Sequence, residues 1–150
     1  MASATRADRE WTDATCPVAR TVDLVGDRWS LLIVRDAMDG PASFTEFRQR
    51  LGIARNILAD RLRRLVEDGI LTTSATPSGK RHVYELTVPG QDLFTTIVAL
   101  RQWGESHAFT DDEPRSTLVD RDGRPLAALH PRSGSGALVT AATTEVRRVD

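Results

Sequence analysis

Two amphipathic helical segments joined by a very short connection constrain the fold of this chain more than any other feature. Ser43 is followed by Glu46 at the spacing of a capping box, which predicts the start of the first helix, and Gly52 ends it. The second helix is expected from about Ala54 to Asp68. Its apolar residues recur at helical spacing, at Leu58, Leu62, Leu65 and Val66. The pair predicts a helix-turn-helix unit.

The segments on either side complete a small domain with one hairpin. A proline at the first helical position and a glycine after the last one mark a helix over residues 17–25, and apolar spacing predicts another over 28–39. After Gly69 the apolar period changes from that of a helix to that of strands. We therefore expect a β-hairpin with strands over residues 70–76 and 82–87, followed by a long helix over 89–107.

This order of elements predicts a winged helix-turn-helix, an α+β fold that is mostly α. A helix enters the major groove only if neighbouring elements hold its polar face outward. In the segment 54–68 the leucines point one way, whereas Asn56, Asp60, Arg63 and Arg64 point the other way. The pattern therefore favours binding to double-stranded operator DNA.

The expected DNA contacts divide by chemistry. The first residues of the 54–68 helix approach base edges, where Arg55 can read guanine and Asn56 adenine. Arg63 and Arg64, farther along, are expected at phosphates, and the hairpin tip at the backbone or the minor groove. The full predicted set is Ser43, Thr45, Ala54, Arg55, Asn56, Ala59, Asp60, Arg63, Arg64, Lys80, Arg81 and His82.

The charge distribution agrees with this assignment. The whole chain has a formal net charge of -1, but residues 43–87 hold eight basic and five acidic residues. A locally basic segment in an acidic chain indicates a nucleic-acid face. The alternative is an ordinary solvated helix face on which Arg63 and Arg64 pair with Asp60 or Glu67. A third hypothesis is a protein-interaction module that kept the fold and lost DNA binding.

Five motifs in order resemble the HxlR family of bacterial transcriptional regulators. They are Cys16-Pro17-Val18, Gly26-Asp27-Arg28-Trp29-Ser30-Leu31-Leu32-Ile33, Phe44-Thr45-Glu46-Phe47-Arg48, the run from Leu58 to Gly69, and Val83-Tyr84-Glu85-Leu86-Thr87. The resemblance implies a homodimeric winged-helix regulator, which we expect to be a repressor. It also implies a dimer interface made by the first and last helices, for which we predict Val18, Val22, Leu93, Phe94, Ile97, Leu100, Arg101 and Trp103.

Cys16 is the only cysteine and has two interpretations. It precedes Pro17 at a helix start, where unpaired amide donors and the helix dipole favour a reactive thiolate. The resemblance implies redox sensing, since some members of the HxlR family sense oxidants or electrophiles through a cysteine at this place. The other interpretation is a small buried apolar side chain. An oxidant or a small molecule is therefore a possible effector.

Residues 110–150 are expected to form a separate C-terminal extension, after a winged-helix domain over residues 1–109. An Asp-Gly turn signal within residues 118–126 predicts a second hairpin. Further short strands are expected over residues 137–140 and 145–149, beyond a flexible Ser-Gly break, which makes the extension β-rich.

Several other classes of function are disfavoured. The single cysteine and the scattered His82, His107 and His130 provide no metal site or disulfide framework, so we expect no metal and no cofactor. No nucleophile elbow or phosphate-cradling loop is present in the sequence, and an enzyme is not expected. The longest aliphatic runs are far shorter than a membrane span, and the first residues lack the pattern of a secretory signal, which predicts a cytoplasmic protein.

Overall fold

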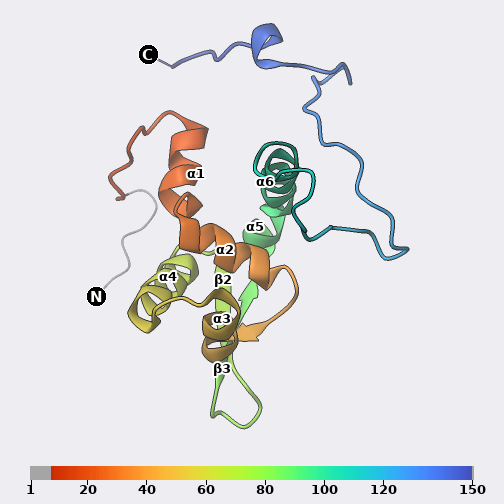
Figure 1. Cartoon of the computed structure of the whole chain (residues 1–150). Coiled ribbons are helices and arrows are strands. Elements are labelled where there is room, and N and C mark those ends of the chain that lie inside the picture. The colour runs from red at the N-terminus through yellow and green to blue at the C-terminus, as the bar shows by residue number, and fades with distance from the viewer. Residues whose placement is uncertain (1–7, 150) are drawn as a thin grey trace. The chain divides into compact units, whose positions relative to one another are not determined.

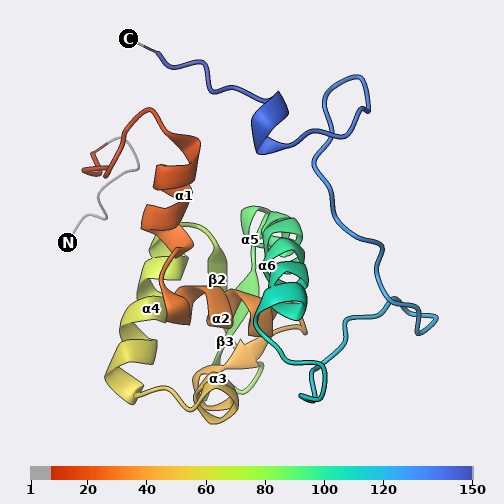
Figure 2. The ribbon, with the colours of Figure 1, turned by 45° about the horizontal axis from the view of Figure 1, so that its top comes forward.

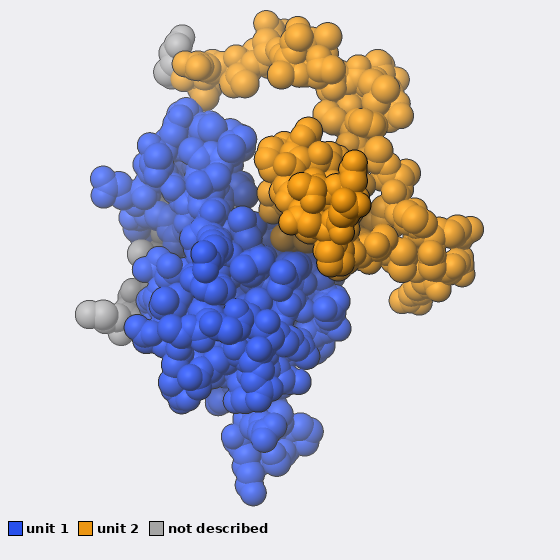
Figure 3. Space-filling model, in the orientation of Figure 1, with its two compact units in different colours: residues 1–94 blue, residues 95–150 orange. Residues whose placement is uncertain are grey.

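The computed structural model describes residues 8–149, which divide into two compact units (Figure 3). The first unit ends at Phe94 and the second begins at Thr95. The last helix is thereby grouped with residues 110–149, although the predicted domain boundary falls after residue 109. None of the helices in residues 8–149 has the length and hydropathy needed to span a lipid bilayer.

Four helices precede the hairpin in the first unit, close to the predicted positions. They are α1 (Pro17–Val25), α2 (Arg28–Ala37), α3 (Phe44–Leu51) and α4 (Arg55–Glu67). The predicted capping box is present, since Ser43 Oγ accepts from the Glu46 N–H at 3.3 Å and Glu46 accepts from the Ser43 N–H at 2.7 Å. Gly52 ends α3 in the left-handed conformation, with φ of 62°, which glycine adopts without strain.

A three-stranded antiparallel sheet forms the rest of the first unit. The hairpin strands are β2 (Leu71–Ala75) and β3 (His82–Leu86), and the two-residue strand β1 (Ala42–Ser43) pairs with the other side of β3. Figure 1 shows the hairpin loop extending beyond the helices as a wing. We did not predict β1, because two residues are too short to show an alternating pattern.

The core lies between α2, α3, α4 and the sheet (Figures 1 and 2). Of the apolar positions predicted in α4, Leu58, Leu62 and Leu65 are buried in it, whereas Val66 is half-buried. The largest fully buried side chains of the core are Phe47, Ile33, Leu58, Leu62, Leu65, Leu71 and Val34. Burial of one such side chain contributes about 1.5–3 kcal/mol. The leucines of α4 therefore anchor its inner face and leave its polar face outward.

The predicted single helix over residues 89–107 is wrong, because the chain forms two helices there. These are α5 (Val88–Asp92) and α6 (Phe94–His107), with a turn at Leu93 between them. The Leu93 N–H donates to the Gly90 carbonyl at 3.2 Å, a tight bond between residues three apart that closes α5. Gly90 is held close to the hairpin, since a Cβ atom there would lie 2.2 Å from the Ile70 carbonyl oxygen.

The second unit consists of α6 and the extension, and the strands predicted in the extension do not form. Within residues 95–149 the only strand-like pairings are two isolated bridges, Val119 with Pro125 and Arg132 with Leu138. Residues 141–143, between the expected strands, form a short 3₁₀ helix. Turns are present where the Gly-containing signals predict them, but segments this short have no sheet on which to extend.

Candidate nucleic-acid interface

The start of α4 and the start of α3 form an open hollow. Phe44 of α3 lines it together with Arg55, Asn56 and Ala59 of α4. The Arg55 guanidinium carbon lies 5.3 Å from the centre of the Phe44 ring, a cation–π contact that restricts the arginine side chain. The N-cap residue Ala54 has no side-chain acceptor for the first N–H groups of α4. These groups are therefore available to an anion such as a phosphate.

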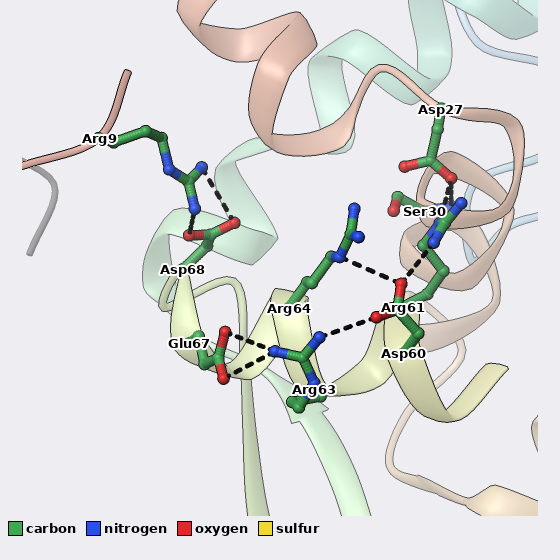
Figure 4. Close-up of polar contacts among 9 residues, drawn as sticks. All are labelled: Arg9, Asp27, Ser30, Asp60, Arg61, Arg63, Arg64, Glu67 and Asp68. Carbon is green, nitrogen blue, oxygen red and sulfur yellow. Dashed lines mark hydrogen bonds and ion pairs between the residues drawn. The ribbon is translucent and has the colours of Figure 1, made fainter. Parts of the chain in front are cut away.

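Farther along α4, the carboxylate of Asp60 contacts three arginine side chains (Figure 4). Asp60 Oδ1 accepts from Arg63 Nη2 at 2.8 Å, and Asp60 Oδ2 accepts from Arg61 Nη1 at 2.6 Å. Arg64 Nε lies 3.1 Å from the same Oδ2. Arg63 also donates to both oxygens of Glu67, at 3.0 and 3.1 Å. Asp60, which we predicted as a DNA contact, thus serves first as an acceptor for its own helix.

The electrostatics of this cluster favour its charged form. Partial burial raises the pKa of Asp60, but the Arg63 hydrogen bond and the Arg64 charge outweigh it and hold that pKa below the ordinary value. The hydrogen bonds from Arg63 to Glu67 and Asp60 raise the pKa of the arginine. Asp60 and Arg63 are consequently charged near neutral pH.

The pairs that the solvated-face alternative requires are therefore present. Arg63 and Arg64 nevertheless keep 57% and 59% of their side-chain surface exposed. Ion pairs this exposed are weak because water and salt screen them. Phosphate oxygens can replace these carboxylates as acceptors, so the pairs are compatible with both interpretations.

A second ion pair fixes the orientation of α4 against α2. Arg61 Nε donates to Asp27 Oδ2 at 2.9 Å, and the same carboxylate caps α2 by accepting from the Ser30 N–H at 3.1 Å (Figure 4). Partial burial raises the pKa of Asp27, but the hydrogen bonds from Ser30 and Arg61 lower it by more. The pKa is therefore below the ordinary value. We did not predict the Asp27 cap, although an aspartate just before a helix is a recognisable capping signal; the pair with Arg61, 34 positions away, has no such signal.

The C-terminal end of α4 is tied to the segment before α1. Arg9 donates to both oxygens of Asp68, at 2.5 and 3.4 Å (Figure 4). The Asp68 side chain is 8% exposed, whereas that of Arg9 is 33% exposed. The guanidinium carbon of Arg9 also lies 5.3 Å from the Trp11 ring centre. No signal in the sequence links residues so far apart, so this contact could not be predicted.

The wing presents its basic residues to solvent. Lys80, Arg81 and His82 are all exposed, and the Thr76 N–H donates to the Arg81 carbonyl at 2.7 Å to close the loop. Hydrogen bonds from Ser43 lower the pKa of Glu46 most, with a smaller contribution from the charge of Arg81. The wing arginine therefore adds to the electrostatic environment at the start of α3.

Two predicted contacts at the start of α3 differ in exposure. Thr45 is exposed, as a DNA contact requires. Ser43 is only 8% exposed, and its hydroxyl is engaged in the capping box. The structure gives Ser43 a role in starting the helix and does not place it on the accessible surface.

The predicted dimer residues are apolar except for Arg101, and five of the eight are exposed. Val18 and Val22 of α1 are 71% and 57% exposed, and Trp103 of α6 is 66% exposed. Phe94 and Leu100 are also exposed, whereas Leu93, Ile97 and Arg101 are half-buried. Exposed apolar groups at this density are typical of surfaces that another molecule covers.

Cys16 is the N-cap residue of α1 and is half-buried. Its Sγ accepts from the Ala19 N–H at 3.5 Å, the contact expected of a capping side chain. The thiol therefore lies at the helix start that the sequence predicts.

The α3–α4 pair, the exposed start of α4 and the basic hairpin define a winged helix-turn-helix DNA-binding protein. The HxlR-like helix-turn-helix family matches residues 24–112. The chain belongs to this family of transcriptional regulators.

Three similar proteins support this assignment. The HTH-type transcriptional regulator Rv3095 of Mycobacterium tuberculosis is 40% identical over 121 residues, which cover 80% of this chain and 70% of that protein. The solved structure of PA1607, described as a candidate transcription factor, is 48% identical with a TM-score of 0.86 and covers 91% of this chain and 97% of its own. The oxidised redox regulator HypR is 31% identical with a TM-score of 0.58 and covers 63% of this chain and 100% of its own.

Proposed function

We propose that this protein is a cytoplasmic, sequence-specific repressor that binds operator DNA as a homodimer, without enzymatic activity. The observation that carries this proposal is the exposed hollow at the start of α4. Arg55 and Asn56 line it, and these two residue types make bidentate contacts with guanine and adenine. The leucines on the opposite face of α4 are buried, so the helix presents this edge outward.

The division of roles follows from the geometry. Arg55, Asn56 and Ala59 approach base edges, and Arg63 and Arg64 exchange their carboxylate partners for phosphates. Lys80 and Arg81 on the wing contact the adjacent backbone. Each phosphate contact releases condensed counterions, so the affinity must fall steeply as salt increases.

A salt titration tests this proposal. Fluorescence anisotropy of the full chain with labelled genomic fragments should give a logarithm of affinity that falls linearly with the logarithm of salt concentration. A protein-interaction module would retain no fragment at any salt concentration. Such a result would end the DNA-binding proposal.

Homodimerisation rests on the uncovered apolar residues of α1 and α6. A charge at Trp103 would be buried in a paired interface at a high cost in free energy. Trp103→Asp should therefore yield monomers in sedimentation, while the exposed Thr96→Asp on the same helix tests for a general effect of the added charge. A Trp103→Asp protein that remains dimeric would place the interface elsewhere.

A second candidate function is a thiol-based switch on the same regulator. Two observations favour it: Cys16 caps α1, a helix of the proposed interface, and the similar structure HypR is a redox regulator. Oxidation of Cys16 to a mixed disulfide or an intersubunit disulfide would alter this helix start. Cys16→Ser should keep DNA affinity and lose any response to diamide. Unchanged release of DNA by diamide in this variant would remove Cys16 from the mechanism.

A further inference from the structure

The last part of the chain, residues 131–149, has local structure but no tertiary partner among the described residues. Among the described residues 8–149, the hydrogen bonds and ion pairs of this segment stay inside it, such as the bond from the Ser133 N–H to the Ala137 carbonyl at 2.8 Å. Of its large apolar side chains, Val139 is half-buried and the other three are open to solvent. Leu138 is 60% exposed, Val146 84% and Val149 73%.

The preceding part of the extension, residues 110–130, is in contrast hydrogen-bonded to α6. The Gln102 side-chain amide donates to the Ala127 carbonyl at 3.0 Å and accepts from the Leu129 N–H at 2.7 Å, in the manner of a neighbouring strand. Arg101 donates to the Ser116 carbonyl at 3.1 Å. Residues 110–130 and α6 thereby form one surface, with a groove lined in part by Trp103, His107, Leu126, Leu129 and His130.

The free segment is built from defined turns, not from a flexible break. Residues 119–125 and 132–138 contain the same turn, displaced by thirteen residues. In the first, the Asp120 N–H donates to the Arg124 carbonyl at 2.8 Å; in the second, Ser133 donates to Ala137 at the same distance. Gly123 and Gly136 have positive φ at matching positions. The Ser-Gly break that we expected to be flexible is therefore a hydrogen-bonded turn.

The composition of the segment also requires a covering surface. From Ala137 to Val146 the sequence has six apolar residues and a single charge, Glu145. Disordered tails are rich in charge and poor in apolar residues, which is the opposite pattern. A nineteen-residue segment cannot offset its conformational entropy with local hydrogen bonds alone. It needs more apolar burial than its own unit supplies, because Leu138, Val146 and Val149 stay exposed there.

Two observations point to a second copy of this chain as that surface. The groove on α6 includes Trp103 and is continuous with the face proposed for the homodimer. The extension also belongs to the fold of a similar protein: PA1607 covers 91% of this chain, which exceeds residues 1–109, whereas HypR covers only 63%. In a two-fold dimer both arms would dock in the same way, so the area buried by one arm counts twice.

We propose that residues 131–149 form an arm that packs across the partner subunit of the homodimer. This inference rests on the proposed homodimer. The arm would bury Leu138, Val146 and Val149 and would enlarge the interface toward the roughly 2,000 Å² and more of obligate dimers. The hydrogen bonds of Gln102 with Ala127 and Leu129 hold the chain against α6 just before the arm begins, and so fix the position from which the arm starts.

A cross-linking experiment on the full chain tests the arm. In a Cys16→Ser background, Leu138→Cys is labelled with benzophenone maleimide and irradiated. We expect a covalent product of twice the chain mass. Thr73→Cys, on an exposed wing strand outside the proposed interface, is the matched control and should give at least tenfold less of this product.

A second measurement separates failure of the arm from failure of the dimer. Leu138→Asp combined with Val146→Asp should raise the dimer dissociation constant at least tenfold in sedimentation. If the unmodified chain sediments as a dimer but shows neither cross-linking nor sensitivity to these changes, the arm proposal fails and the homodimer stands. If the unmodified chain is a monomer, both proposals fail, whatever its affinity for DNA.

Discussion

Asp60 Oδ1 accepts a hydrogen bond from Arg63 Nη2 at 2.8 Å, on the face of α4 that is proposed to meet DNA. The other oxygen of the same carboxylate serves Arg61 and Arg64. The Asp60 carboxylate therefore competes with DNA phosphates for the arginines of α4. If the proposed contacts form, this competition lowers the affinity for DNA, because each arginine must exchange a carboxylate for a phosphate when it binds.

Removal of this competing carboxylate should strengthen non-specific binding. Asp60→Asn withdraws one negative charge and frees Arg63 and Arg64 to bind phosphates. We expect the affinity for a duplex of arbitrary sequence to rise several-fold, measured by anisotropy at low and high salt. Asp120→Asn in the extension makes the same change in net charge and should have little effect. A fall in affinity for Asp60→Asn would mean that the carboxylate positions the arginines productively or contacts a base.

Base-edge and phosphate contacts should respond differently to truncation. Asn56→Ala should cost about 1–3 kcal/mol, mainly at one base position of the operator. Arg63→Ala should weaken all sequences similarly and reduce the magnitude of the salt slope by about one. Competition assays with operator variants measure both effects. If the two variants act alike on all sequences, the proposed division of α4 is wrong.

The contact between Asp27 and Arg61 should make stability depend on pH. Asp27→Asn retains a capping side chain but loses the ion pair, so it should lower the free energy of unfolding by up to about 1 kcal/mol at pH 7. Because the pKa of Asp27 is lowered in the folded protein, its contribution is present above the ordinary value of 3.8 and is lost as the pH falls through the folded value. Urea denaturation at pH 7, 5 and 3 measures the difference between the two proteins. A difference that does not shrink at pH 3 would contradict this assignment.

Gly90 should tolerate no side chain. A Cβ atom there would lie 2.2 Å from the Ile70 carbonyl oxygen, so Gly90→Ala must move either α5 or the hairpin. We expect a loss of about 1–3 kcal/mol in the free energy of unfolding, measured by denaturant titration. Gly104→Ala, in α6 with no atom within 4 Å of its added methyl, should be neutral or stabilising. Equal effects of the two substitutions would show that α5 and the hairpin can move apart at Gly90 without a loss of stability.

The helices and the hairpin could be predicted because their signals are local. The capping box at Ser43, the glycine at position 52 and the leucine spacing of α4 each act within a few residues. The α5–α6 break at Leu93 was missed because the apolar spacing continues through it, and the close approach of nearby Gly90 to the carbonyl of Ile70, twenty residues earlier, leaves no signal in the sequence. The prediction of strands in the extension was wrong for a related reason. A strand needs a neighbouring strand to pair with, and the sequence pattern does not show whether one is present.

The candidate site divides in the same way. The exposure of Arg55, Asn56 and the wing residues follows from helix periodicity and turn chemistry, so their surface positions could be predicted. The contacts of Asp27 with Arg61 and of Arg9 with Asp68 join residues 34 and 59 positions apart and could not. Ser43 is predicted both as the cap of its helix and as a DNA contact; the cap is present, and the side chain is only 8% exposed.

The spacing of protected half-sites tests the central claim most directly. Operator fragments selected with the full chain would be footprinted at single-base resolution. Two symmetry-related copies of α4 in successive major grooves predict two inverted half-sites centred about 10 base pairs, or one helical turn, apart. A single unpaired half-site, or protection without any sequence preference, would contradict the proposal of a sequence-specific homodimeric regulator.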